Sequence, residues 1–212
     1  MGITERRERE KEQRKNDIVD AAERVFFKRG HEYATMDDVA NEAELSKGTL
    51  YLYFKNKEDL YLAIHLRGNK ILHSLFEKAV KNEKSGIEKT RSIGTAYVEY
   101  FHKYPDYFNA MLYYESRDID FADKDSIAAE CLVEGKTTMD LLINSIATGI
   151  NDGSIRSDID PVKTALCLWG QTTGILQIAS LKEKNILVKH FSISARILID
   201  YNFNLIYHAL RA

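Results

Sequence analysis

Residues 35–54 read TMDDVANEAELSKGTLYLYF, which predicts two short helices joined by a tight connection. Thr35 is the expected N-cap of the first helix, and Asp38 follows three residues later, close to a capping box. Ser46 is the expected N-cap of the second helix, which runs to about Phe54. Two short helices joined by about three residues form a helix-turn-helix.

A longer amphipathic helix precedes this pair and ends at Gly30. Its apolar residues recur at helical spacing and are Ile18, Ala21, Ala22, Val25 and Phe26. Residues 5–15 are almost all charged. This segment is either the solvated start of the helix or a basic arm that contacts phosphate.

The remaining chain predicts longer helices. Their expected ranges are 57–75, 86–103, 105–115, 126–150, 161–182 and 190–210, with residues 116–125 as a loop. Two prolines in 212 residues leave few helix breakers. The sequence therefore predicts an all-α chain of about nine helices, divided into a three-helix head over residues 1–56 and a larger helical body over residues 57–212.

The composition excludes several protein classes. The net charge of −2 excludes a globally basic nucleic-acid coat. We expect a cytoplasmic protein, because the chain has no apolar run of about 18 residues and no apolar signal core at its start. Cys131 and Cys167 lie in apolar helical patterns and are expected to be buried, reduced thiols. No histidine pair has metal-ligand spacing, so we expect no metal and no cofactor.

The short helix that begins after Ser46 has the composition of a surface that enters the major groove of DNA. Small side chains let its backbone come close, a lysine reaches a guanine edge or a phosphate, and tyrosine hydroxyls reach phosphates. The starts of the neighbouring helices favour phosphate through their partial positive charge. Each residue alone is more typical of packing or solvation. The candidate DNA contacts are Thr35, Met36, Ser46, Lys47, Gly48, Thr49, Tyr51, Tyr53 and Lys57.

Residues 18–60, IVDAAERVFFKRGHEYATMDDVANEAELSKGTLYLYFKNKEDL, resemble the tetracycline-repressor (TetR) family of regulators. The match includes the Ser-x-Gly-Thr-Leu-Tyr-x-Tyr-Phe pattern at 46–54. One departure is Glu44, where the family often has Gly; a left-handed residue there costs about 1–2 kcal/mol. The resemblance implies a homodimeric repressor that binds an operator in double-stranded DNA and carries a helical effector-binding domain.

The last two helices are expected to form the dimer interface. Residues 165–180 carry no charge, which predicts a helix buried on all sides. The final helix has two apolar faces, and a body of this size covers only one. The other is expected to face a second copy in a four-helix interface, although a core within one chain is the alternative. The candidate interface residues are Gly170, Gly174, Leu198, Phe203, Ile206 and Leu210.

The middle helices are rich in aromatic residues, which predicts an apolar pocket for a small apolar or aromatic effector. Its candidate residues are Tyr97, Phe101, Met111, Cys131, Met139 and Trp169. We expect the helix from Lys57 to link head and body, so that an effector changes the spacing of two heads. Alternatives are a DNA binder without effector, an activator, and an enzyme, for which no catalytic motif exists. The effector, operator, regulated genes and subfamily do not follow from the sequence.

Overall fold

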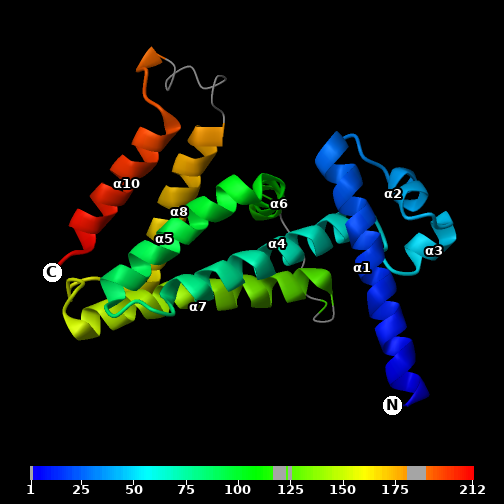
Figure 1. The fold of residues 1–212 in the computed structure, drawn as a ribbon, viewed down its shortest axis with the longest axis horizontal. Coiled ribbons are helices and arrows are strands. Elements are labelled where there is room, and N and C mark those ends of the chain that lie inside the picture. Colours follow the sequence, from blue (N-terminus) through cyan, green and yellow to red (C-terminus); the bar gives the residue numbers. More distant parts are fainter. Residues whose placement is uncertain (1, 117–122, 124–125, 181–189) are drawn as a thin grey trace. The chain divides into compact units, whose positions relative to one another are not determined.

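A computed structural model describes residues 2–116, 123, 126–180 and 190–212. These residues form nine helices, shown in Figure 1. They are α1 (Ile3–Arg29), α2 (Met36–Glu42), α3 (Lys47–Tyr51), α4 (Lys57–Val80), α5 (Gly86–Lys103), α6 (Pro105–Glu115), α7 (Ile127–Asp152), α8 (Pro161–Ser180) and α10 (Ala195–Leu210). The prediction of an all-α chain with about nine helices is confirmed.

The predicted caps are present. The Thr35 side chain accepts a hydrogen bond from the Asp38 amide at 3.1 Å, and the Asp38 carboxylate accepts one from the Thr35 amide at 3.0 Å. This is a full capping box. Ser46 accepts a hydrogen bond from the Thr49 amide at 3.1 Å. Asn56 accepts one from the Asp59 amide at 2.7 Å and begins α4.

Some boundaries differ from the prediction. Helix α3 ends at Tyr51 rather than near residue 54. Helix α10 begins at Ala195 rather than at 190, because Ser194 caps it by accepting a hydrogen bond from the Ile197 amide at 3.3 Å. The predicted end of the preceding helix at 182 lies outside the described residues, as does most of the predicted loop over 116–125.

The chain divides into two compact units. The first holds residues 1–69 and 106–134, and the second holds residues 70–105 and 135–212. This division differs from the sequence boundary at residue 56, because the first unit continues into α4 and takes in most of α6 and the start of α7. The assignment of separate functions to residues 1–56 and 57–212 stays a prediction.

The first unit has its core between α1, α2, α3 and the start of α4. Ile18, Val39, Leu50 and Leu60 are each 0% exposed and supply one side chain from each helix. Helix α6 joins this unit through Tyr107, whose hydroxyl donates to a Glu23 carboxylate oxygen at 2.7 Å. The three short helices are therefore held on a packed base.

The second unit is built on α5, α8 and α10, which pack against one another. Two glycines let α5 and α7 approach each other closely, because a Cβ placed at Gly86 would lie 1.9 Å from the Gly149 backbone nitrogen. The backbones of α5 and α7 therefore touch where neither helix carries a side chain. The Tyr97 hydroxyl shares a buried 2.8 Å hydrogen bond with the Thr173 hydroxyl and so fixes α5 against α8.

Candidate DNA-binding surface and effector pocket

Helix α3 presents its first turn to solvent over a buried anchor. Leu50 is 0% exposed and Phe54, just beyond the helix, is 1% exposed, so these two side chains hold α3 to the core. Ser46, Lys47 and Gly48 are exposed. The predicted recognition residues therefore lie together at one accessible tip of the first unit.

The two tyrosines of the predicted surface differ. Tyr51 is 49% exposed, so its hydroxyl is available to a phosphate. Tyr53 is partly buried and packs against the core of the unit. Sequence reasoning also missed two exposed apolar side chains of the first unit, Tyr33 at 76% and Leu52 at 81% exposed. Tyr33 could have been found, because it lies two residues before the Thr35 cap.

Both lysines of the predicted surface are engaged within the protein. The Lys47 ammonium forms an ion pair with the Asp37 carboxylate, and both side chains are more than half exposed. The Lys57 ammonium donates to the backbone carbonyls of His31 at 2.9 Å and Ala34 at 3.3 Å. This ammonium therefore stabilises the turn between α1 and α2, and a phosphate contact at Lys57 stays a prediction.

The start of α2 keeps only part of its predicted role. The Met36 side chain is buried, so only its backbone amide remains for a phosphate. Thr35 is exposed, but its hydroxyl donates to Asp38 at 2.8 Å as part of the capping box. The phosphate-binding capacity of this helix start thus rests on backbone amides.

The backbone shows whether glycine is required at Glu44, in the turn after α2, and at Gly48, in α3. Glu44 has φ 55°, and the Leu45 amide donates to the Ala40 carbonyl at 2.9 Å. Glu44 therefore occupies the left-handed position at the end of α2, as predicted. A Cβ placed at Gly48 would meet only the Ser46 Oγ, at 3.8 Å. Nothing in the described part of the protein requires glycine at position 48.

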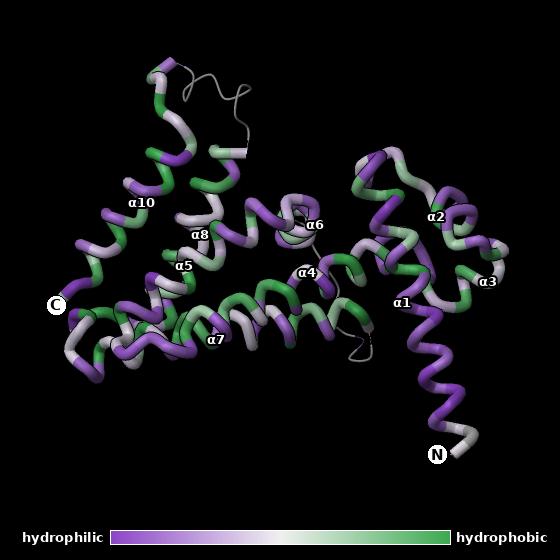
Figure 2. Tube along the Cα trace, in the orientation of Figure 1, coloured by the Kyte–Doolittle hydropathy of each residue, from purple (hydrophilic) through white to green (hydrophobic). Residues whose placement is uncertain are grey.

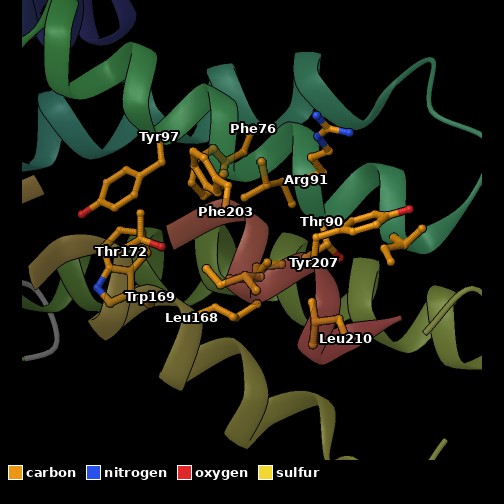
Figure 3. Close-up of a pocket in the computed structure, with 15 residues that line it drawn as sticks. Phe76, Thr90, Arg91, Tyr97, Leu168, Trp169, Thr172, Phe203, Tyr207 and Leu210 are labelled. Carbon is orange, nitrogen blue, oxygen red and sulfur yellow. The ribbon is translucent and has the colours of Figure 1, made fainter. Parts of the chain in front are cut away.

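A cavity of about 50 Å³ lies in the second unit between α5, α8 and α10 (Figure 3). Its lining is apolar or neutral except for Arg91. The lining residues are Phe76, Ile87, Thr90, Arg91, Ile93, Gly94, Tyr97, Leu142, Leu168, Trp169, Thr172, Phe203, Ile206, Tyr207 and Leu210. A Cβ at Gly94 would lie 2.6 Å from the Phe203 ring, so glycine makes room for that ring.

Only two of the predicted pocket residues line this cavity. Tyr97 and Trp169 stack with ring centroids 4.6 Å apart and an interplanar angle of 21°. Phe101 and Met139 belong to the same unit but are absent from the lining. Met111 and Cys131 belong to the first unit. The role of these four residues in effector binding stays a prediction, because helical periodicity does not say which compact unit an apolar face joins.

The predicted dimer residues on α10 face their own unit. Phe203, Ile206 and Leu210 line the cavity, and Leu198 is half-buried. The opposite line of α10 is exposed instead, with Ile197 at 60%, Tyr201 at 62% and Leu205 at 49%. The assignment of the two apolar faces was therefore reversed.

Helix α8 is not buried on all sides in the single chain. Val162 is 50% and Leu166 is 56% exposed, and Gly170 is also exposed. Cys167, also on α8, is exposed, whereas Cys131 on α7 is buried as predicted. A Cβ at Gly170 or Gly174 would meet nothing within 4 Å. These glycines therefore accommodate no other helix of the described chain.

The first unit buries a polar pair away from the tip. The rings of His65 on α4 and Tyr114 on α6 stack with centroids 4.1 Å apart and an interplanar angle of 14°. His65 Nδ1 and the Tyr114 hydroxyl are buried without a hydrogen-bond partner in the described part of the chain. Burial lowers the pKa of His65 to about 4 and raises the pKa of Tyr114 to about 12.

The described ranges contain neither a candidate metal cluster nor a membrane-spanning helix. No group of three or more His, Cys, Asp or Glu side chains there could hold a metal ion. None of the described helices is long and apolar enough to cross a membrane.

Comparison with known proteins supports the geometry of the tip. Residues 18–64 match the family model of bacterial regulatory proteins, tetR family. That range contains the end of α1, all of α2 and α3, and the start of α4. Over these residues the chain is similar to the TetR family. The TetR family signature thus coincides with the three-helix core and its exposed tip.

Two relatives show how far the similarity reaches. The transcriptional activator FasR of Mycolicibacterium smegmatis is 27% identical over 137 residues, which are 65% of this chain and 60% of FasR. The transcriptional repressor KstR2 of Rhodococcus jostii is 28% identical over 149 residues, which are 69% of this chain and 70% of KstR2. The matched region thus spans less than two thirds of the length of FasR.

A solved structure shares the fold of the whole chain. The transcriptional regulator FadR of Bacillus subtilis, in complex with stearoyl-CoA, has a TM-score of 0.72 at 18% identity. The alignment covers 91% of this chain and 97% of FadR. At this identity the likeness shows a shared fold.

Proposed function

We propose that this protein is a regulator of the TetR family, a ligand-responsive repressor that binds a palindromic operator as a homodimer. The observation that carries the proposal is the exposed first turn of α3, where Gly48 leaves open space beside Lys47 and Thr49. A helix that offers bare backbone and short polar side chains fits against base edges. DNA binding is assigned to residues 1–56, and effector binding and dimerisation to residues 57–212.

Dimerisation is supported by apolar lines left exposed on two helices that pack together. Val162 and Leu166 repeat at i, i+4 on α8, and Gly170 and Gly174 continue the line without side chains. On α10 the line is formed by Ile197, Tyr201 and Leu205. A second copy would cover both lines in a four-helix interface. Two heads on one dimer then read half-sites about 34–36 Å apart.

The effector we propose is an amphiphile with an apolar tail and an acidic head. The cavity offers an apolar lining for the tail, and Arg91 is exposed at its edge (Figure 3). No carboxylate of the described chain pairs with the Arg91 guanidinium. The complex of FadR with stearoyl-CoA supports the same chemical class, because that ligand joins a long alkyl chain to an anionic group.

The cavity of about 50 Å³ is smaller than such a tail. For comparison, an engineered apolar cavity of about 150 Å³ holds a single benzene. The ligand therefore has to move side chains, and the ring of Phe203 over Gly94 is one that fills the space now. Helices α4 and α7 each have residues in both compact units. A rearrangement in the second unit can therefore be transmitted to the first through these helices.

Selection of bound duplexes from a random DNA pool tests the DNA-binding part. A palindrome with two half-sites one helical turn apart supports the dimeric regulator. Recovery of no enriched sequence at any salt concentration would refute it. Leu166→Glu combined with Tyr201→Glu should give a monomer in sedimentation velocity, and this monomer should bind the palindrome no better than a single half-site.

Operator affinity measured with decanoate, decanoyl-CoA and decanol tests the effector class. The two anionic compounds should weaken binding about 5–150-fold, the range of a 1–3 kcal/mol coupling. Decanol, with the same tail and no charge, should act much less. Arg91→Gln should remove this difference, whereas Lys89→Gln, a cation on the same helix outside the lining, should keep it. Equal effects of decanoate and decanol would contradict the anionic head.

Activation is the second candidate, because the relative FasR is a transcriptional activator. A dimer that occupies promoter DNA represses without further contacts, whereas an activator needs a surface for another protein. A reporter gene placed behind the selected operator separates the two. Deleting the regulator should raise expression for a repressor and lower it for an activator.

A further inference from the structure

The first half of α1 extends away from the core of the first unit as a solvated helix. Every side chain from Thr4 to Arg14 is exposed, and Figure 2 shows this part of α1 as hydrophilic throughout. Local side-chain bonds support the helix, such as the 2.8 Å pair between Arg6 and Glu10. The segment packs on nothing in the described chain, so packing does not explain its presence.

Four cations of this segment lie on one side of the helix. At about 100° per residue, the spacing i, i+4, i+7, i+8 gathers them within roughly a quarter to a third of a turn. They are Arg7, Lys11, Arg14 and Lys15. The same spacing leads on to Ile18, Ala22 and Val25, which are buried in the core. The cationic row therefore continues the face of α1 that turns towards α2 and α3.

The row is electrostatically unsatisfied. Arg6, on a different side of α1, has a carboxylate partner, but no ion pair of the described residues includes any of the four row cations. Glu8, Glu10 and Glu12 flank the row, but none of them lies within ion-pair distance of a row cation. Four cations held on one side of a helix, facing solvent, form a binding surface for a linear polyanion.

We infer that this row binds the DNA backbone outside the half-site read by α3. The inference rests on the proposed function. The row belongs to the same compact unit as α3 and continues the core face of α1. One DNA duplex can therefore contact both the row and α3. Residues 3–17 extend for about 22 Å at about 1.5 Å per residue, which corresponds to about six base pairs at about 3.4 Å each.

The chemistry favours duplex DNA over a lipid surface. Residues 4–17 contain no apolar side chain, so this helix has nothing to insert between lipid tails. The helix therefore holds its partner by charge alone. Such contacts fix position and add affinity without reading sequence.

The test compares two duplexes by fluorescence anisotropy over a range of salt concentrations. One duplex ends at the outer edges of the selected half-sites, and the other extends ten base pairs further on each side. Arg7→Gln with Lys11→Gln removes two row cations. Arg6→Gln with Arg9→Gln is the matched control, since it removes the same charge from other sides of the same segment. Glutamine preserves helix propensity, and circular dichroism checks the helix content.

Each lost phosphate contact lowers the slope of log affinity against log salt by about 0.9. The row variant should therefore lose up to about 2 in slope on the extended duplex and little on the short one. The control should keep the wild-type slope on both. Equal losses for both variants, or an unchanged slope on the extended duplex, would overturn the inference.

The outcomes separate this inference from the function on which it rests. If the wild-type protein binds no duplex, the proposed function fails. If it binds the short duplex and the row variant behaves as wild type on both, only the inference fails. Loss of binding to phosphatidylglycerol vesicles in the row variant, with DNA binding unchanged, would also overturn it in favour of a lipid surface.

Discussion

Protonation of His65 should destabilise the protein as the pH falls from neutral to 4. His65 is 4% exposed and stacks on the Tyr114 ring, and its Nδ1 has no hydrogen-bond partner in the described chain. Burial lowers the pKa of this imidazole from 6.5 to about 4. The unfolded chain thus takes up a proton at a higher pH than the folded protein, and stability present above pH 6.5 is lost towards pH 4.

The magnitude follows from that difference in pKa. At about 1.36 kcal/mol per pH unit, the gap between 6.5 and about 4 corresponds to a loss of about 3 kcal/mol. This is a large part of the about 5–15 kcal/mol by which domains are usually stable. The hydrogen bond from Thr35 lowers the pKa of Asp38 in the folded protein, so the unfolded chain protonates this carboxylate first and stability also falls as the pH drops towards 4. The contribution of His65 therefore has to be measured as a difference between variants.

The variant is His65→Phe, which keeps a planar ring beside Tyr114 and cannot be protonated there. Urea denaturation at fixed protein concentration should give, for wild type, a free energy of unfolding that falls by about 3 kcal/mol more than that of the variant between pH 7 and pH 4. His208→Phe, at an exposed position on α10, should show the wild-type dependence. Parallel curves for wild type and His65→Phe would refute the argument that burial suppresses protonation.

Three further changes test the recognition tip. Gly48→Ala should raise the free energy of unfolding by about 0.5–1 kcal/mol, since the new Cβ meets only Ser46 at 3.8 Å. The same change should lower operator affinity at least about tenfold. Unchanged affinity would mean that DNA does not fill the space beside Gly48. Asp37→Asn should free Lys47 and raise duplex affinity about threefold to tenfold at 0.1 M salt in an anisotropy titration, with a steeper salt slope. Glu44→Gly should raise the free energy of unfolding by about 1 kcal/mol, because the residue has φ 55°, and no gain in thermal denaturation would count against backbone strain there.

The local structure of the head could be predicted from residues close together in the sequence. Thr35 with Asp38, and Ser46 with Thr49, set the starts of α2 and α3 through hydrogen bonds that span three residues. The left-handed turn at Glu44 depends in the same way on its immediate neighbours. These interactions are local, so one sequence was enough to locate the helix-turn-helix and its exposed tip.

The features that the sequence did not reveal all depend on what a helix packs against. Helix α10 has two apolar faces of similar character, and only its packing on α5 and α8 decides that Phe203 faces the cavity and Tyr201 faces solvent. Lys57 pairs with carbonyls that lie 23 and 26 residues earlier, a contact that no periodic pattern reports. The sequence by itself determined which residues are apolar, capped or charged, and hence the helices and the recognition tip. The tertiary structure alone decided which surface each apolar face covers, because burial free energy depends on the area removed from water and not on the partner that removes it.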